Sequence, residues 1–156
     1  MTAPKSNQLN GIETDLSQCH GTISISTGGP EFLSITSRVQ DWLESIQAES
    51  GLITVFIRHT SASLTIQENA DPDVLLDLKD KLARLAPEEY DYRHHSEGLD
   101  DMPAHIKAML TSTMLNIPVK NGKILLGTWQ GVYLIEHRAR PQDRFLELYF
   151  LGIFSQ

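Results

Sequence analysis

The sequence predicts a single α+β domain. Its 156 residues suffice for one hydrophobic core, and no repeat, low-complexity tract or linker divides them. Strand-like and helix-like segments follow one another irregularly, without the steady strand–helix alternation of a doubly wound fold. The expected order is β-β-α-β-β-α-α-β-β-β, with sheet layers and flanking helices. Residues 1–17 lack an apolar signal-peptide core, so we expect a flexible lead-in there and one domain over 18–156.

The first three elements are expected within residues 21–51. Residues 21–27 are rich in β-branched side chains and predict a strand, which Gly28-Gly29-Pro30 closes. Residues 32–35 predict a short second strand. The spacing Ser37-Arg38-Val39-Gln40 is that of a capping box and predicts a helix start, and Gly51 is expected to end this segment. The helix carries an apolar stripe of Val39, Trp42, Leu43 and Ile46.

Two strands and a helix are expected next. Residues 52–57 are apolar on both faces, which is typical of a central strand. Residues 63–67 alternate between polar and apolar side chains and predict a strand with one solvent-exposed or functional face. Asp71-Pro72 predicts a helix start, with Asp71 as N-cap, and Pro87 predicts its end. Leucines 75, 78, 82 and 85 form the apolar stripe of this helix.

A further helix and a β-rich end complete the chain. Asp101-Met102-Pro103 predicts the helix start, with a core face of Ile106, Met109 and Leu110. Asn121-Gly122 predicts a tight type I′ hairpin between 115–120 and 123–126, and Pro118 favours a sheet edge for its first arm. Residues 131–137 and 145–151 predict two more strands.

Composition and charge exclude several classes of function. A net charge of −7 argues against a nucleic-acid-binding protein, although Arg138, Arg140 and Arg144 leave a local anion site open. No run of about 18 apolar residues is present, so no membrane span is expected. The single cysteine, Cys19, cannot form an internal disulfide and favours the reducing cytoplasm.

An unusually polar stretch follows the strand predicted at 52–57. Arg58-His59-Thr60-Ser61 comes first, and Glu68-Asn69 follows the next predicted strand. Buried polar groups cost free energy unless they bond to each other, to a metal or to a ligand. This stretch therefore predicts one wall of a site.

Histidines supply the second candidate feature. His59, His94, His95, His105 and His137 all lie beside polar or turn-forming segments. Imidazole serves as a metal ligand or as a general acid or base, but no HExxH motif or paired-cysteine spacing marks a metal site. Asp101 and His105 are spaced i, i+4 on one helix face, so Asp101 can orient the His105 ring; an exposed Asp–His pair is the equal alternative.

The third feature is the segment Gly127-Thr128-Trp129-Gln130-Gly131. Two glycines flank a Trp-Gln pair at the start of a predicted strand, and glycine lets backbone approach a ligand closely. Taken alone, the segment favours a bulged strand with a packed tryptophan over a binding site.

Together these motifs resemble the YjbQ family over about residues 18–153. The motifs that carry the resemblance are His59-Thr60-Ser61-Ala62-Ser63-Leu64-Thr65, Glu68-Asn69-Ala70-Asp71-Pro72, Asp100-Asp101-Met102-Pro103-Ala104-His105-Ile106-Lys107 and Gly127-Thr128-Trp129-Gln130-Gly131. The resemblance implies a single YjbQ-like α+β domain over 18–156, a homotrimer, and a divalent metal near the subunit boundary.

The resemblance also implies a reaction. Family members are described as secondary thiamine-phosphate synthases, which join hydroxymethylpyrimidine diphosphate to thiazole phosphate and release pyrophosphate as a side activity. The motifs carry over three groups of residues. Metal ligands are expected at His94, His105 and His59, catalytic groups at Glu68, His59 and Asn69, and substrate-binding groups at Ser61, Thr128, Trp129 and Gln130. His95 lies where the family varies and is left out of the metal set.

Two other functions remain open. Magnesium, the usual partner of diphosphates, prefers oxygen ligands, whereas a histidine cluster suits zinc. Zinc is therefore the expected metal, with magnesium as the alternative, and a zinc-dependent hydrolase of a small ester, amide or phosphoester is a rival function. A non-catalytic trimeric module that binds a small phosphorylated or anionic metabolite is the third. None of the three involves nucleic acid or a membrane.

Overall fold

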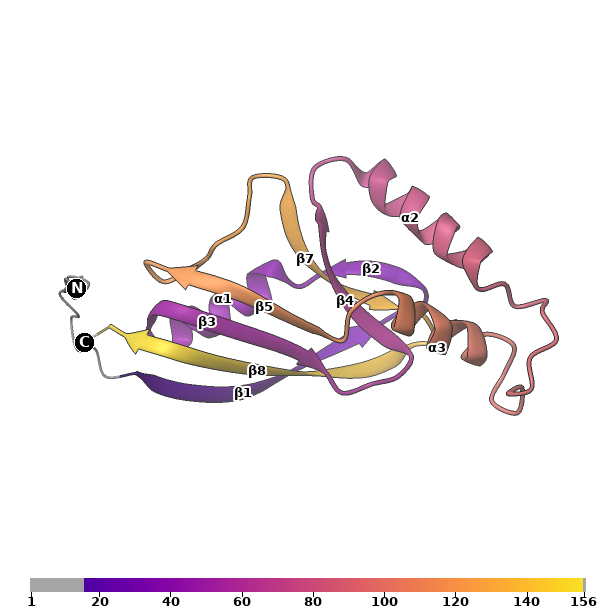
Figure 1. Ribbon diagram of the computed structural model, residues 1–156, viewed down its shortest axis with the longest axis horizontal. Helices are drawn as coiled ribbons and strands as arrows, with labels where there is room; N and C mark the ends of the chain where they lie inside the picture. The colour runs from indigo at the N-terminus through magenta and orange to yellow at the C-terminus, as the bar shows by residue number, and fades with distance from the viewer. Residues whose placement is uncertain (1–15, 156) are drawn as a thin grey trace, which may run out of the picture.

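Two antiparallel sheets and three helices form the protein, shown in Figure 1 as a computed structural model that describes residues 16–155. The larger sheet has the strand order β1-β8-β3-β5-β6, with β1 at Ser17–Thr27, β8 at Gln142–Phe154, β3 at Ala48–Ile57, β5 at Met114–Lys120 and β6 at Lys123–Ile124. The smaller sheet has the order β2-β7-β4, with β2 at Glu31–Ser34, β7 at Gln130–Glu136 and β4 at Ala62–Glu68.

The α+β prediction is confirmed. Four strands, β5 to β8, follow the last helix, one for each of the four segments predicted there, so the expected order with three final strands is one strand short. Fully buried side chains from both sheets, among them Ile53, Leu148 and Phe150 from one and Leu64 and Leu134 from the other, form a single core. Of the predicted lead-in 1–17, only Leu16 and Ser17 lie within the described residues, and Ser17 already begins β1.

Helix α1, Thr36–Ser45, begins and ends earlier than expected. The predicted capping box is wrong: Ser37 lies inside the helix, and the N-cap is Ile35, whose side chain makes no capping bond. Gly51 does not end the helical segment either, because β3 has already begun at Ala48. The glycine is needed in the strand, where an added Cβ would lie 2.3 Å from the carbonyl oxygen of Leu151 on β8.

Helix α2, Pro72–Leu85, matches its prediction at both ends. The Asp71 carboxylate accepts a hydrogen bond of 3.0 Å from the Asp73 amide, Pro72 is the first helical residue, and Ala86 is the C-cap before Pro87. No residue of α2 is buried, although the helix is amphipathic. The helix therefore packs on the surface of β2, β4 and the next helix without inserting fully buried side chains into the core.

Helix α3, Asp101–Leu110, starts where predicted but buries the opposite face. The expected core face is wrong, since Met109 is 78% exposed and Leu110 is 53% exposed. The buried residues are Asp101, Pro103, Ala104 and Ala108. The small side chains of Ala104 and Ala108 let α3 pack closely against β4. The polar Asp101 faces inward, where Arg138 donates a hydrogen bond to its carboxylate.

The hairpin between β5 and β6 is confirmed. Asn121 and Gly122 have φ values of 52° and 73°, as a type I′ turn requires. Pro118 pairs with Leu52 on β3, and β6 pairs only with Val119 and Lys120, so the remainder of β5 forms the sheet edge. β3 lies between β8 and β5, the central place predicted for it. Within 16–155, no helix is long and apolar enough to cross a membrane.

Candidate metal centre

Three side chains converge at the start of α3. His94 Nε2 lies 2.6 Å from Asp101 Oδ2, and His105 Nε2 lies 3.4 Å from the same oxygen. One donor atom from each residue falls within 4.8 Å of the other two, and the two imidazole centroids are 5.6 Å apart. Two imidazole nitrogens and a carboxylate oxygen on one point are donors typical of a zinc site.

The loop 86–100 brings His94 to this point, whereas Asp101 and His105 are one turn apart on α3. Figure 1 shows this loop projecting beyond α2 and α3 at one end of the molecule. His94 and His105 thus come together because the loop folds back over the first turn of α3, the helix that follows it.

Arg138 fixes the position of Asp101. Arg138 Nη1 donates a hydrogen bond of 2.5 Å to Asp101 Oδ1, and its Nε donates one of 2.9 Å to Asp100. Asp101 is 1% exposed, so its carboxylate is held by arginine on one oxygen and turns the other toward the two histidines. Burial raises the pKa of Asp100, but hydrogen bonds from the Ala139 amide and Arg138 outweigh it and lower that pKa overall.

The His105 ring is oriented by the backbone. Its Nδ1 lies 3.0 Å from the Thr60 carbonyl oxygen, which can only accept, so Nδ1 carries the proton. In the neutral ring, Nε2 then has a free lone pair that faces Asp101 Oδ2, which is the arrangement of a metal-ligating histidine. Asp101 Oδ2 faces Nε2 rather than the Nδ1–H of His105 and accepts a hydrogen bond of 2.6 Å from His94 Nε2. A metal that replaced this proton would meet Asp101 as a third donor, not only as the residue that orients His105.

His59 is not part of this group. Its Nε2 accepts a hydrogen bond of 3.0 Å from the Phe145 amide, and its Nδ1 lies 3.4 Å from Arg144 Nη1. Burial, followed by the positive charge of Arg144, lowers the pKa of His59. The lone pair that a metal would need is occupied by β8 backbone, so the structure does not bring His59 into the metal set.

Ser61 belongs to a buried ion pair. Arg144 Nη2 donates to the Ser61 hydroxyl and carbonyl oxygens at 3.1 and 3.2 Å. The same guanidinium binds Glu136 through two hydrogen bonds, of 2.6 and 2.7 Å. Burial raises the pKa of Glu136, but bonds from Arg144, the Arg138 amide and Thr27 outweigh it and lower that pKa. Arg138 and Arg144 are thus both paired internally and do not form an anion site on the surface.

The other predicted site residues gather elsewhere. Asn69 Nδ2 donates to the Gln130 carbonyl at 3.2 Å, and the Asn69 amide donates to the Trp129 carbonyl at 3.1 Å. Glu68 pairs with Gln130 across β4 and β7, and its carboxylate accepts from the amides of Ala70 and Asp71. Thr128, Trp129 and Gln130 are exposed, Trp129 to 64%.

The predicted site residues therefore form two separate groups at opposite ends of β4. Ala62 begins the strand beside the Thr60 carbonyl that holds His105, and Glu68 ends it. Six residue steps at about 3.3 Å each separate the ends by roughly 20 Å. One chain does not bring Glu68, Asn69 and Gln130 to the metal donors.

Asp101 and Arg138 have larger roles in the structure than the sequence indicates. The sequence predicts only that Asp101 orients His105 and that Arg138 belongs to a basic cluster. The i, i+4 spacing of Asp101 and His105 was the available signal for the first. The contact between Arg138 and Asp101 spans 37 residues, and nothing local in the sequence indicates it.

His137 gives a prediction on acid stability. It is 4% exposed, and burial, followed by the charge of Lys107, lowers its pKa to about 4. In the unfolded chain the ring takes up a proton near pH 6.5, so stability falls as the pH falls from about 6.5 to about 4, by up to about 3 kcal/mol. His137→Asn should remove this slope in urea unfolding at pH 7, 5.5 and 4. An unchanged slope would contradict the assignment.

Small hollows adjoin the metal donors. A cavity of about 140 Å³ is lined by His94 and by Tyr90 and Tyr92, whose ring centroids are 4.8 Å apart. An open cleft is lined by residues 56–61 and Thr113, and so includes Thr60, whose carbonyl oxygen contacts His105. Of the three donors, His94 lines the loop cavity, so a small molecule can approach that donor from the loop side.

The comparisons with known proteins agree on one family. A family model described as UPF0047 protein YjbQ-like matches residues 21–152. UPF0047 protein sll1880 of Synechocystis is 53% identical over 129 residues, which cover 82% of this chain and 88% of that protein. UPF0047 protein YjbQ of Salmonella typhimurium is 42% identical over 124 residues, which cover 79% and 90%.

Solved structures agree with the fold. An uncharacterised protein of the yjbq/upf0047 family from Clostridium acetobutylicum has a TM-score of 0.77 and 38% identity, covering 83% of this chain and 98% of that one. A YbjQ-like protein of unknown function from Sulfolobus solfataricus has a TM-score of 0.82 at 23% identity, covering 88% and 99%. At that identity the second likeness concerns the fold alone.

Proposed function

The chain belongs to the UPF0047 YjbQ-like family, and we propose that it is a metal-dependent enzyme acting on a small phosphorylated or anionic substrate. The observation that supports this most is the convergence of His94 Nε2, His105 Nε2 and Asp101 Oδ2 within 4.8 Å. Three protein donors leave coordination positions free for substrate or water, as catalytic sites require and closed structural sites do not.

The donor set fits a divalent metal on chemical grounds. Two neutral imidazoles and one carboxylate suit zinc better than magnesium, which favours oxygen ligands. A metal held there would supply a Lewis acid that stabilises negative charge on a phosphate or lowers the pKa of a water. Magnesium is the alternative when the substrate brings its own phosphate oxygens.

The protein groups around the donors prepare the site. Arg138 holds Asp101 Oδ1, so that Oδ2 keeps its direction, and the Thr60 carbonyl fixes the tautomer of His105. The loop that carries His94 also lines the adjoining cavity with Tyr90 and Tyr92, which can shield a bound substrate from water. These contacts position the donors before substrate arrives, and preorganisation of this kind lowers the cost of the reaction.

Thiamine-phosphate synthase activity is part of the proposal as a secondary activity. The resemblance of the motifs implies it, and a cationic centre would favour departure of pyrophosphate. The histidine-rich donors favour a second candidate, a zinc-dependent hydrolase of a small ester, amide or phosphoester. A non-catalytic metabolite-binding module is the third, and it shares the site without the reaction.

We further propose that a homotrimer completes the site. Glu68, Asn69 and Gln130 lie roughly 20 Å from the metal donors within one chain, and a second copy can supply them. Large apolar side chains also face solvent on the outer side of the larger sheet. Leu52 on β3 adjoins Leu151 on β8, Phe56 lies opposite Met114 on β5, and all four are exposed. Apolar surface of this kind is typical of an interface between subunits.

The three functions are distinguished by turnover and metal content. Protein purified without a histidine tag is assayed with hydroxymethylpyrimidine diphosphate plus thiazole phosphate, and with a panel of phosphoesters, esters and amides. Release of pyrophosphate with loss of activity on chelation supports the synthase, and faster turnover of a panel compound supports the hydrolase. Saturable binding with no turnover of any compound would reject both enzymes in favour of the module.

A shared site predicts complementation between two inactive variants. His105→Ala lacks the metal half and Trp129→Ala lacks part of the other half. When the two variants mix at random in a closed ring, about a quarter of the sites regain both intact halves. We expect activity to return to about that fraction, with a sedimentation mass of about three times 17.5 kDa. A monomeric mass, or no recovery, would contradict the shared site.

A further inference from the structure

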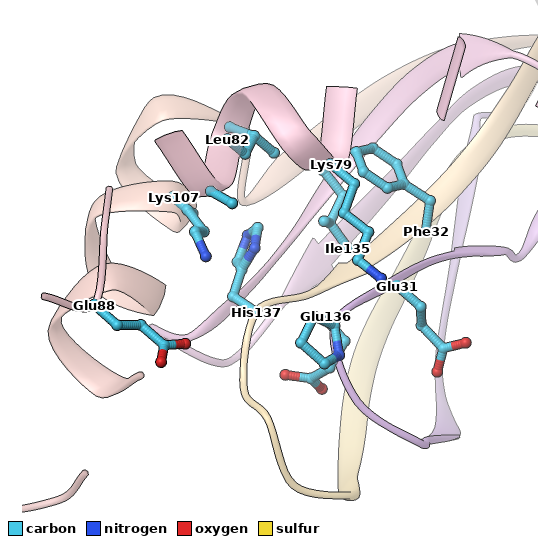
Figure 2. Close-up of a pocket in the computed structure, with 11 residues that line it drawn as sticks. Glu31, Phe32, Lys79, Leu82, Glu88, Lys107, Ile135, Glu136 and His137 are labelled. Atoms are coloured by element: carbon cyan, nitrogen blue, oxygen red, sulfur yellow. The ribbon is translucent and has the colours of Figure 1, made fainter. Parts of the chain in front are cut away.

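A cavity of about 200 Å³ lies beneath α2, away from the metal donors. Its cover is α2, its floor is β2 and the end of β7, and its inner wall is α3. Figure 2 shows the side chains of this cavity, with Phe32 and Ile135 on one side and Lys107 and His137 on the other. The space is present because α2 buries none of its residues and leaves the surface beneath it unfilled.

The lining has an apolar middle with charged side chains on both sides of it: Glu31 and Lys79 lie beside Phe32 and Ile135, and Glu88 and Lys107 lie beside His137 (Figure 2). Phe32, Leu82, Ala83 and Ile135 supply an apolar body of the cavity. At the other end, Lys107 from α3 and His137 after β7 extend into the same space (Figure 2). An apolar pocket with a few polar groups in its lining is the usual form of a small-molecule site.

The two polar groups at this end have unused capacity for hydrogen bonds. His137 Nε2 lies 2.8 Å from the Ser63 hydroxyl, which occupies that nitrogen, whereas Nδ1 has no protein partner within residues 16–155 and is not among the fully buried atoms. Lys107 has no carboxylate within 4.0 Å among those residues. Glu88 attracts the Lys107 ammonium from beyond that distance and forms no ion pair with it. A bound anion would therefore still relieve part of the cost of half-burying this charge.

Acidic residues limit the charge of the ligand. Glu31 and Glu88 also line the cavity, and Glu31 accepts a hydrogen bond from the Gly28 amide. The lining holds two ammonium groups, Lys79 and Lys107, and three carboxylates, of which Glu136 is paired with Arg144. The two other carboxylates repel a doubly charged phosphate more than a singly charged group. The lining therefore favours one negative charge on an apolar body.

We infer that this cavity binds a small monocarboxylate with an apolar chain. The carboxylate accepts a hydrogen bond from Lys107 Nζ and lies beside the His137 ring, and the chain lies between Phe32, Ile135 and Leu82. The cavity contains none of His94, Asp101 and His105, so the inference stands apart from the proposed metal-dependent reaction.

Calorimetric titration with hexanoate tests the inference, with hexan-1-ol as the uncharged counterpart. Hexanoate is expected to bind saturably with one site per chain and more tightly than hexanol. Lys107→Met keeps the length of the side chain but removes its charge. It should weaken hexanoate binding about ten- to a hundredfold, the usual worth of a charged hydrogen bond, and leave hexanol unchanged.

Two further variants make the result decisive. Lys81→Met, on the exposed side of α2 and outside the lining, is the matched control and should bind hexanoate as the wild type does. Ala83→Trp fills the cavity and should abolish binding of both ligands, whether or not Lys107→Met folds. Absence of saturable hexanoate binding, or equal weakening by Lys81→Met and Lys107→Met, would overturn the inference.

Discussion

His105→Ala is expected to lose its divalent metal, with an affinity at least about 100-fold weaker than that of the wild type. The substitution removes one of three donors, and changes to residues that merely orient ligands already cost roughly 10- to 100-fold. The hydrogen bond from His105 to the Thr60 carbonyl is lost as well, at a cost of only about 1 kcal/mol of stability. Metal content by elemental analysis of untagged protein, together with a competitive chelator titration, measures the effect.

Two other histidine variants serve as controls. His95→Ala changes the exposed neighbour of His94, which is outside the donor group, and should keep the metal. His59→Ala should also keep it, because the His59 Nε2 is bonded to β8 backbone. Loss of metal in His59→Ala would place this histidine in the site after all, and unchanged metal content in His105→Ala would reject the donor group.

Arg144→Met is expected to destabilise the protein by about 3–5 kcal/mol, a large share of the usual stability of a domain. The guanidinium and the Glu136 carboxylate are both almost fully buried, at 4% and 0% side-chain exposure. Removing the arginine leaves a carboxylate in the core without its two strongest hydrogen bonds. The midpoint of urea unfolding at pH 7 measures the loss.

A double variant distinguishes the pair from the packing of arginine. Glu136→Leu combined with Arg144→Met removes both charges and should be less destabilised than the sum of the single changes. Arg140→Met changes an exposed arginine in the same segment and should alter stability by less than about 0.5 kcal/mol. Additive effects of Glu136→Leu and Arg144→Met would show that the two residues do not interact.

The pair also has a predicted pH range of its own. Because the folded pKa of Glu136 is lowered, its contribution is complete above the unfolded value near 4.5 and is lost as the pH falls through the folded value. This range lies below most of the His137 range, which spans about pH 6.5 to 4. The two contributions can therefore be separated in one series of unfolding curves.

The elements that could be predicted correctly are those whose ends depend on adjacent residues. The Asp71-Pro72 start of α2 and the Asn121-Gly122 turn both follow from backbone preferences of two adjacent residues, and both are found where expected. The capping box at Ser37 has the same kind of signal but is not used. The Thr36 hydroxyl accepts a hydrogen bond from the Val132 amide on β7 instead, so sheet contacts fix the start of α1.

Distant contacts decided what could not be predicted. The apolar pattern of α3 predicts Ile106, Met109 and Leu110 in the core. In the structure, Arg138 holds Asp101 inward instead, and the two residues lie 37 positions apart in the sequence. The helix rotates accordingly and exposes Met109 and Leu110. The burial of Glu136 could not be predicted either, because its main partner, Arg144, lies on the separate strand β8.

The candidate site was predicted in part. His94 and His105 meet as expected, and Asp101 joins them because the i, i+4 spacing puts both residues on one face of α3. Glu68, Asn69 and Trp129 also lie together, but at the far end of β4 from the histidines. Motifs indicate which residues belong to a site, whereas the distance between them depends on strand length and on how many copies of the chain assemble.

The lack of buried residues in α2 has a consequence for hydrogen exchange. Local opening of a segment costs little when few apolar contacts are lost, so α2 is expected to detach while the sheets remain folded. Its backbone amides should exchange with solvent far faster than those of β3 and β8, whose residues fill the core. Such openings would expose the cavity beneath the helix many times within one unfolding lifetime, and they provide a route by which a ligand can enter a space that α2 covers.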